Sequence, residues 1–168
     1  MKTTTLMIDV TYKGSTSLGI EFETGDNIED FILTFVNDEA GFRGENDEWE
    51  EVTDMEDITY EVTHWGDAEE YENLQNIDLL NEIAEADPSY DWDVISAAID
   101  CDIQPEDIDE AYSGKYSSDE DFAEETAESC GMIDKSLSWP YTCIDWECAA
   151  RELMYDYSEA NGHYFRNL

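Results

Sequence analysis

Carboxylates are the side chains of this sequence that could most readily carry out chemistry. Two carboxylates held close together can act as general acid and base, as in glycosidases. The chain has 168 residues, of which 45 are Asp or Glu, so close pairs arise by chance throughout and none stands out. His64 and His163 are isolated in the sequence, and we expect both to be structural. No catalytic residue is predicted, and an enzyme ranks last among the function classes that the sequence leaves open.

The metal-binding and nucleotide-binding motifs in the sequence are incomplete or absent. Asp100-x-Asp102 begins like a calcium-binding EF-hand loop, but Pro105 stands where that loop has Gly and Ala111 where it has Glu. The sequence has no glycine-rich phosphate-binding loop and no dinucleotide-binding motif. It therefore predicts no metal site and no cofactor.

The four cysteines indicate a reducing compartment. They form no C-x-x-C motif, and Cys143 and Cys148 lack the spacing and the histidine partners of a zinc site. Residues 1–9 lack the long apolar segment of a secretory signal peptide, and no apolar run of about 18 residues could span a membrane. We therefore expect reduced thiols and a cytoplasmic protein.

Negative charge is the dominant property of the chain. The 45 acids face only 7 Lys and Arg, which gives a formal net charge of −38, and both kinds are spread along the sequence. Without a basic surface the protein is not expected to bind nucleic acid or an anionic membrane directly. Hydrophobic residues make up 41% and aromatic residues 12% of the chain, which is enough to build a core. The expected ligand is therefore a strongly basic partner of a folded protein.

The sequence around residues 117–131 predicts an acidic helix. Ser117-x-x-Glu120 and Ser118-x-x-Asp121 are alternative capping boxes, and Gly131 is a typical helix terminator. Carboxylates three or four residues apart in a helix repel one another, and no base lies between these acids. The apolar positions with helical spacing are Phe122, Ala123, Thr126, Ala127 and Cys130. The acids between them are Asp119, Glu120, Asp121, Glu124, Glu125 and Glu128.

Three explanations of this charge remain open at the level of composition: adaptation to high salt, storage or chaperoning of basic proteins, and imitation of DNA. Salt adaptation does not by itself account for an unbroken acidic helix face, and chaperones more often use a disordered acidic tail. Duplex DNA carries one charge per about 1.7 Å of its axis, so the net charge matches roughly 65 Å, on the order of 19 base pairs. Carboxylates on rigid helices can fix such a spacing.

Hydrophobic periodicity predicts an α+β fold of three small sub-domains. Residues 1–72 should form an N-terminal sheet with one helix. The central unit, residues 73–103, should contain two short helices separated by Asp87-Pro88-Ser89. Residues 104–168 should form a C-terminal α+β domain with a hairpin at Asn161-Gly162.

Individual elements of these sub-domains are predicted from shorter patterns. In the N-terminal part, strands are expected at residues 6–12, 18–22 and 58–62, and residues 13–17 and 41–48 should be loops. Asp26 should cap a helix over residues 28–36. In the C-terminal part, a helix is expected near residues 105–112. A further helix, capped by Asp145, should bury Trp146, Ala149, Ala150, Leu153 and Met154.

The C-terminal part resembles the antirestriction proteins of the ArdA family. In that family a Tyr-x-Gly-x-Tyr segment precedes an acidic helix, as Tyr112-x-Gly114-x-Tyr116 does here. An Ile-Asp-Tyr…Ala-Arg-Asp-Leu run follows, and in this chain Trp146 replaces its Tyr and Glu152 its last Asp. The likeness covers residues 105–168 well, residues 71–84 loosely and the N-terminal part weakly. Residues 136–140 depart from the helix that the family has there.

The resemblance implies an elongated, three-part acidic protein that forms a homodimer and mimics bent B-form DNA. Such proteins occupy the DNA-binding groove in the methyltransferase core of type I restriction–modification enzymes and catalyse no reaction. They act in the cytoplasm of a host bacterium and are encoded by mobile genetic elements, namely phages, plasmids and transposons. The alternative is an acidic inhibitor or chaperone of another basic DNA-binding protein, such as an anti-CRISPR-like inhibitor or a nucleoid-protein antagonist.

Two groups of C-terminal residues are candidates for these roles. The expected dimer contact lies in residues 155–165, where Tyr157, Tyr164 and Phe165 give an apolar patch and Arg151 and Arg166 lie nearby. The acids expected to mimic phosphates are Glu106, Asp107, Asp109, Glu110, Asp119, Glu120, Asp121, Glu124, Glu125, Glu128, Asp145, Glu147 and Glu152.

Overall fold

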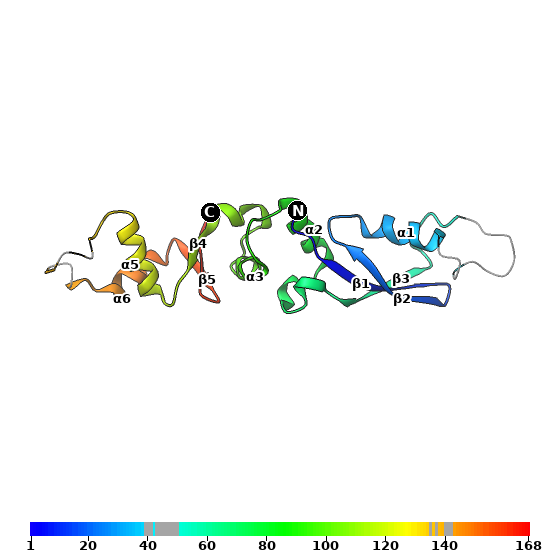
Figure 1. Ribbon diagram of the computed structural model, residues 1–168, viewed down its shortest axis with the longest axis horizontal. Coiled ribbons are helices and arrows are strands. Elements are labelled where there is room, and N and C mark those ends of the chain that lie inside the picture. The colour runs from blue at the N-terminus through cyan, green and yellow to red at the C-terminus, as the bar shows by residue number, and fades with distance from the viewer. Residues whose placement is uncertain (39–41, 43–50, 135, 137, 140–142) are drawn as a thin grey trace. The chain divides into compact units, whose positions relative to one another are not determined.

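The computed structural model describes residues 1–38, 42, 51–134, 136, 138–139 and 143–168. Within these residues, six α-helices and two three-stranded antiparallel sheets make a mixed α+β fold (Figure 1). The chain divides into two compact units, Met1–Pro88 and Ser89–Leu168, called here the N-terminal and C-terminal units. None of the helices in the described residues is both long enough and apolar enough to cross a membrane.

The sheet of the N-terminal unit has the order β2-β1-β3. Its strands are β1 (Thr5–Tyr12), β2 (Ser15–Glu23) and β3 (Ile58–His64), which confirms the three predicted strands. Lys13 and Gly14 alone form the first hairpin turn, with φ angles of 47° and 84°. Two consecutive residues with positive φ are typical of a type I′ turn. Ser15 already pairs with Tyr12, so the loop is shorter than the predicted residues 13–17.

Two helices complete the N-terminal unit: α1 (Ile28–Asp38) and α2 (Ile77–Ala86). The prediction that Asp26 caps α1 is wrong, because the Asn27 Oδ1 accepts the hydrogen bond from the Asp30 backbone N–H at 3.0 Å. Helix α1 packs on the sheet through Phe31, whose ring centroid lies 5.3 Å from that of Phe22 in β2. Short 3₁₀ turns, Gly66–Ala68 and Glu72–Leu74, precede α2.

Alternation in β1 produces the core of the N-terminal unit. Leu6, Ile8 and Val10 are fully buried on one side of the central strand. Ile32 and Val36, one turn apart on α1, are also fully buried, as expected when an apolar helix stripe covers a sheet face. The loop predicted over residues 41–48 lies outside the described residues, apart from Phe42.

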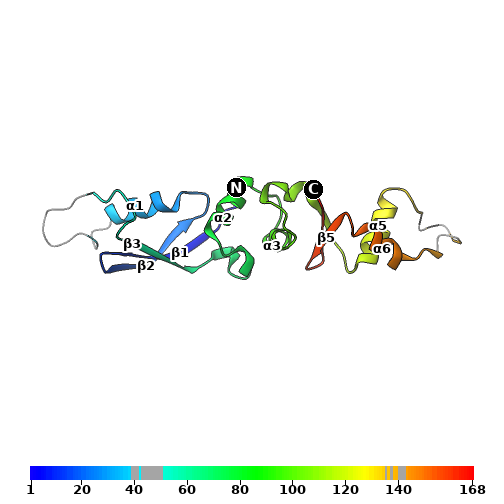
Figure 2. The ribbon, with the colours of Figure 1, turned by 180° about the vertical axis from the view of Figure 1, so that it is seen from behind.

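The C-terminal unit contains a second sheet of order β4-β6-β5, of which β5 is labelled in Figure 2. Asn161 and Gly162 join β5 to β6 with φ angles of 54° and 82°, which confirms the predicted hairpin turn. The strands are β4 (Tyr112–Lys115), β5 (Tyr157–Ala160) and β6 (His163–Arg166). The helices are α3 (Trp92–Asp100), α4 (Ile108–Ala111), α5 (Asp119–Ser129) and α6 (Trp146–Leu153), and a 3₁₀ turn at Pro105–Asp107 precedes α4.

Two C-terminal helices differ in part from their predicted form. The helix expected near residues 105–112 is a 3₁₀ turn followed by a single α-helical turn, and Tyr112 already belongs to β4. Helix α6 is capped by Asp145 as predicted, since its Oδ1 accepts from the Cys148 backbone N–H at 3.0 Å. Of the five side chains expected to be buried there, Ala150 is buried, and Trp146, Ala149, Leu153 and Met154 are half-buried.

The three-part division is not confirmed. Helix α2 belongs to the N-terminal unit and α3 to the C-terminal unit, so residues 73–103 are shared between the two units. The predicted separator, Asp87-Pro88-Ser89, coincides with their boundary. A central sub-domain therefore stays a prediction based on sequence pattern and family resemblance.

Candidate functional site

The acidic helix α5 begins at a side-chain cap. The Ser118 Oγ accepts a hydrogen bond from the Asp121 backbone N–H at 3.2 Å, and the Asp121 carboxylate accepts from the Ser117 N–H and hydroxyl. The structure therefore selects the second of the two predicted capping boxes. Gly131, with φ 68°, ends the helix as predicted, and the backbone N–H of Met132 bonds back to the Ala127 carbonyl at 2.9 Å.

An aromatic cluster attaches α5 to the sheet of its unit. Phe122 is buried and stacks on Tyr164 of β6, with ring centroids 4.5 Å apart. The rings of Tyr116 and Tyr157 lie 5.0 and 4.9 Å from the same phenylalanine. Because three rings from separate segments surround Phe122, the orientation of α5 is fixed by packing.

The Tyr112-x-Gly114-x-Tyr116 segment has a steric explanation in this cluster. Gly114 has a φ of 124°, and a Cβ at this position would lie 2.9 Å from a ring carbon of Tyr116. The backbone bends here, since the pairing of β4 with β6 shifts between Tyr112 and Gly114. Glycine is therefore required for Tyr116 to fold back over the strand and reach Phe122.

Of the six carboxylates of α5, Asp119 is bonded to Tyr164 of β6, and helical spacing places the other five on the side of the helix opposite Phe122 and Ala123. Five acids between positions 120 and 128 span about 12 Å of helix axis, an average interval of about 3 Å per charge. Phosphates on one DNA strand follow one another at about 3.4 Å measured along the duplex axis. The last turn of α5 carries no basic residue, so its negative charges there oppose the helix dipole. The five acids are Glu120, Asp121, Glu124, Glu125 and Glu128.

Hydrogen bonds stabilise the negative charges in the first turn of α5. The Tyr164 hydroxyl donates a hydrogen bond of 2.7 Å to the Asp119 carboxylate, which ties the helix start to β6. Burial, followed by this bond, raises the pKa of the Tyr164 hydroxyl. The Glu120 pKa is lowered, first by a hydrogen bond from its own backbone N–H and then by the Ser118 hydroxyl. The Glu120 side chain is thus held as a carboxylate at neutral pH.

Several of the acids that were predicted to mimic phosphates are bonded to other residues of the C-terminal unit. Asp109 accepts from the Ser89 backbone N–H and hydroxyl at 3.0 and 3.1 Å. Glu110 forms an ion pair of 3.2 Å with Arg166. Together with the bonded Asp119 and the caps Asp121 and Asp145, these side chains hold the fold in place.

The other predicted mimic acids differ in exposure. Asp107, Glu124 and Glu128 are half-buried. The exposed ones are Glu106, Glu120, Glu125, Glu147 and Glu152.

The expected dimer residues are only partly accessible. Tyr164 is 2% and Phe165 0% exposed, so both belong to the core of the C-terminal unit, and Tyr157 is half-buried. Tyr155, at the start of the same segment, is 73% exposed. Strand β5 lies at the edge of its sheet, with β6 on its inner side.

An acidic hollow in the C-terminal unit was not predicted from the sequence. Its volume is about 490 Å³, and it lies between the end of α3, the start of α5 and β5. Burial, and then the charges of Glu159, Asp100 and Asp102, raise the pKa of its Cys101 thiol to about 11, so that thiol is unreactive. In the described residues no cluster of three or more His, Cys, Asp or Glu could hold a metal ion. The lining residues are Asp100, Cys101, Asp102, Asp119, Met154, Tyr157, Ser158 and Glu159.

Comparison of the chain with protein-family models, curated proteins and solved structures finds no match. The likeness of residues 105–168 to the antirestriction family therefore rests on the motif residues themselves.

Proposed function

We propose that this protein is a non-catalytic DNA mimic, which binds the DNA-binding groove of a type I restriction–modification enzyme and inhibits it. The observation that carries the proposal is the acidic face of α5, where carboxylates follow one another along the helix axis at about the interval that phosphates of one strand have along the duplex axis. The buried aromatic cluster around Phe122 holds this face on a sheet. The named target follows from the resemblance of the segment that contains this face.

A rigid helix suits this role better than a flexible tail would. Fixed carboxylates can meet several basic side chains of a DNA-binding groove at once without first losing conformational entropy. Like charges that repel in the free protein are also relieved when a basic groove neutralises them. This gives a reason for an acidic helix that carries no compensating base in its last turn.

The elongated, three-part arrangement and the homodimer belong to the same proposal. Two chains together would match the charge of nearly 40 base pairs, on the order of two turns of DNA for each copy. Because Tyr164 and Phe165 are buried, we propose that the contact between copies lies at Tyr155 and at β5, the last strand of its sheet.

Competition with DNA tests the proposal directly. A purified type I enzyme is incubated with the protein and with a labelled duplex of about 40 base pairs that contains its recognition site. The protein should displace the duplex, and its affinity should fall at least about tenfold between about 50 and 200 mM salt. A complex that contains enzyme, duplex and inhibitor together would contradict mimicry. Inhibition of a nucleoid protein or CRISPR effector instead would support the alternative acidic inhibitor.

A further inference from the structure

A stretch without net charge follows the acidic helix α5. Residues 130–144, between α5 and α6, contain one acid, Asp134, and one base, Lys135, although 45 of the 168 residues of the whole chain are acids. The carboxylate of this stretch is bonded within it, since the Asp134 Oδ1 accepts a hydrogen bond from the Ser136 backbone N–H at 2.9 Å. The acidic surface of α5 is therefore continued by a segment that has little charge to offer a partner.

The backbone of Met132 is fixed at the end of α5, but its side chain is exposed. The Met132 N–H bonds to the Ala127 carbonyl and the Gly131 N–H to the Glu128 carbonyl, both at 2.9 Å. This pair of bonds is a Schellman motif, in which the residue after the glycine frequently packs its side chain on the last turn of the helix. Met132 does so very little, because it is 75% exposed. An apolar side chain is thus held in water at the end of the helix whose last acid is Glu128.

Trp139 is the most exposed large hydrophobic side chain among the described residues. It is 79% exposed, whereas the other tryptophans that the structure describes, Trp65, Trp92 and Trp146, are half-buried. Apolar surface in contact with water is unfavourable, and tryptophan is enriched among the residues that contribute most to binding in protein interfaces. Trp139 therefore has the chemistry of a contact residue for an apolar partner surface.

We propose that Met132 and Trp139 form an apolar anchor, which enters an apolar pocket of the target protein at the border of its basic groove. This inference rests on the proposed function and adds a second kind of contact to it. The charge of α5 indicates the partner. A second copy that approached the anchor with its own anchor would bring its acidic helix close to the first, and like charges repel. A basic groove attracts the acids of α5 on the same approach.

The anchor and the acids of α5 contribute to binding in different ways. Attraction between the carboxylates and a basic groove is screened by salt. Burial of the anchor is not screened, and it lowers the heat capacity of the complex relative to the free proteins. Carboxylates alone bind basic surfaces in general, whereas an anchor favours a target that has a matching pocket. The anchor thus supplies selectivity that charge cannot supply.

The salt dependence of binding to the purified type I enzyme separates the two contributions. The Kd of the full chain is measured between about 50 and 400 mM salt. Trp139→Ala should raise the Kd at least about tenfold at every salt concentration and leave the slope of log Kd against log salt unchanged. A triple variant with Glu120, Glu124 and Glu128 changed to Gln should instead reduce that slope. Leu18→Ala is the matched control, because Leu18 is 73% exposed in the N-terminal unit, and it should change the Kd less than about twofold.

Further measurements identify the contact as apolar. Trp139→Phe keeps an aromatic ring and should retain most of the affinity, whereas Met132→Ser should raise the Kd roughly threefold. Calorimetry at several temperatures should give a less negative heat-capacity change of binding for Trp139→Ala than for the wild type. Circular dichroism should show each variant to be folded, because both side chains of the anchor are exposed.

The results also distinguish failure of the anchor from failure of the proposed function. If the wild type displaces the DNA duplex from the enzyme but Trp139→Ala binds as tightly as Leu18→Ala, the anchor is overturned and DNA mimicry stands. The anchor is overturned as well if Trp139→Ala reduces the salt slope as the triple variant does, or if it converts a sedimenting dimer into a monomer. A wild-type protein that does not displace the duplex overturns both proposals.

Discussion

At the residue scale, the carboxylates of the C-terminal unit have two different tasks. One group makes contacts that hold the unit together, as the Tyr164–Asp119 and Arg166–Glu110 contacts illustrate. The second group consists of carboxylates on the helix surfaces, with Glu125 on α5 and Glu147 on α6 as exposed examples. Mutational tests of mimicry must use the second group, since loss of the first group alters the fold.

Single neutral replacements on α5 should have small effects on inhibition. Glu120→Gln or Glu124→Gln removes one charge among many, and exposed ion pairs contribute little individually. We expect either variant to weaken inhibition of the restriction enzyme by less than about tenfold. Complete loss of inhibition in a single variant that circular dichroism shows to be folded would instead indicate a specific site.

Tyr164→Phe should destabilise the C-terminal unit without changing its charge. It removes the 2.7 Å hydrogen bond to Asp119, and hydrogen bonds to charged groups contribute about 1.5–3 kcal/mol. We expect the free energy of unfolding, measured in urea, to fall by about 1.5–3 kcal/mol. Tyr155→Phe is the matched control, because Tyr155 is 73% exposed and should change stability by less than about 0.5 kcal/mol. Equal effects of the two variants would mean that the Asp119 bond contributes nothing.

At the element scale, α5 is a helix whose stability comes from packing and whose charge opposes it. Phe122 and Ala123 are buried, while the acids repel along the exposed side. Natural helices usually place bases near their C-terminal end, and this one does not. An arrangement of charges that lowers the stability of its own helix is typical of a functional surface.

Neutralising the acidic row of α5 should separate inhibition from stability. A triple variant with Glu120, Glu124 and Glu128 changed to Gln should weaken inhibition by roughly the product of the three single factors, because the sites share no reacting centre. Its thermal midpoint should change little, because the removal of like-charge repulsion along the helix is offset by loss of the favourable charge and the Ser118 hydrogen bond at Glu120.

The matched control for this triple variant removes the same number of charges from a helix of the N-terminal unit. Asp78, Glu82 and Glu85 are exposed on α2, and changing them to Asn, Gln and Gln should weaken inhibition less. Equal losses from the two triple variants would mean that total charge alone, and not the α5 surface, determines binding.

At the scale of the whole molecule, a net charge of −38 makes self-association unfavourable through most surfaces. A homodimer therefore needs a contact of low charge. Tyr155 is a large exposed side chain beside the edge strand β5, and edge strands present unpaired backbone groups to a second copy.

The proposed dimer is tested by sedimentation at micromolar concentration and moderate salt. Wild-type protein should sediment as a dimer, and Tyr155→Ser should shift the equilibrium toward monomer because it removes the exposed ring. Leu18→Ser is the control, since Leu18 is also 73% exposed but lies in the N-terminal unit. A wild-type protein that sediments only as a monomer would contradict this part of the proposal.

Much of the local structure was determined by the sequence alone. Alternation gave the strands of the first sheet, Asn161-Gly162 gave the second hairpin, and Gly131 gave the C-terminal end of α5, whereas Ser117 and Ser118 were alternative starts between which the structure decides. These features are predictable because they depend on contacts between residues close in the chain. The choice of Asn27 over Asp26 as a cap was not predictable, since adjacent capping residues compete on equal terms.

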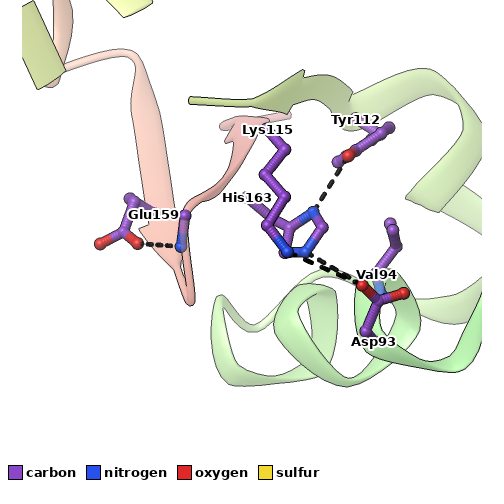
Figure 3. A network of polar contacts seen from close by, with 7 residues as sticks. Asp93, Val94, Tyr112, Lys115, Glu159 and His163 are labelled. Carbon is purple, nitrogen blue, oxygen red and sulfur yellow. Dashed lines mark hydrogen bonds and ion pairs between the residues drawn. The ribbon is translucent and has the colours of Figure 1, made fainter. Parts of the chain in front are cut away.

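Only the tertiary structure decided which residues are buried and which residues from distant parts of the chain contact one another. Tyr164 and Phe165 looked available for a dimer, but packing against α5 and β4 buries them. His163 looked isolated in the sequence, but the fold brings it into contact with Tyr112 and Asp93, which are distant from it along the chain (Figure 3). Burial and long-range pairing depend on how helices and strands meet, and a pattern of charges and apolar residues along one segment does not contain that information.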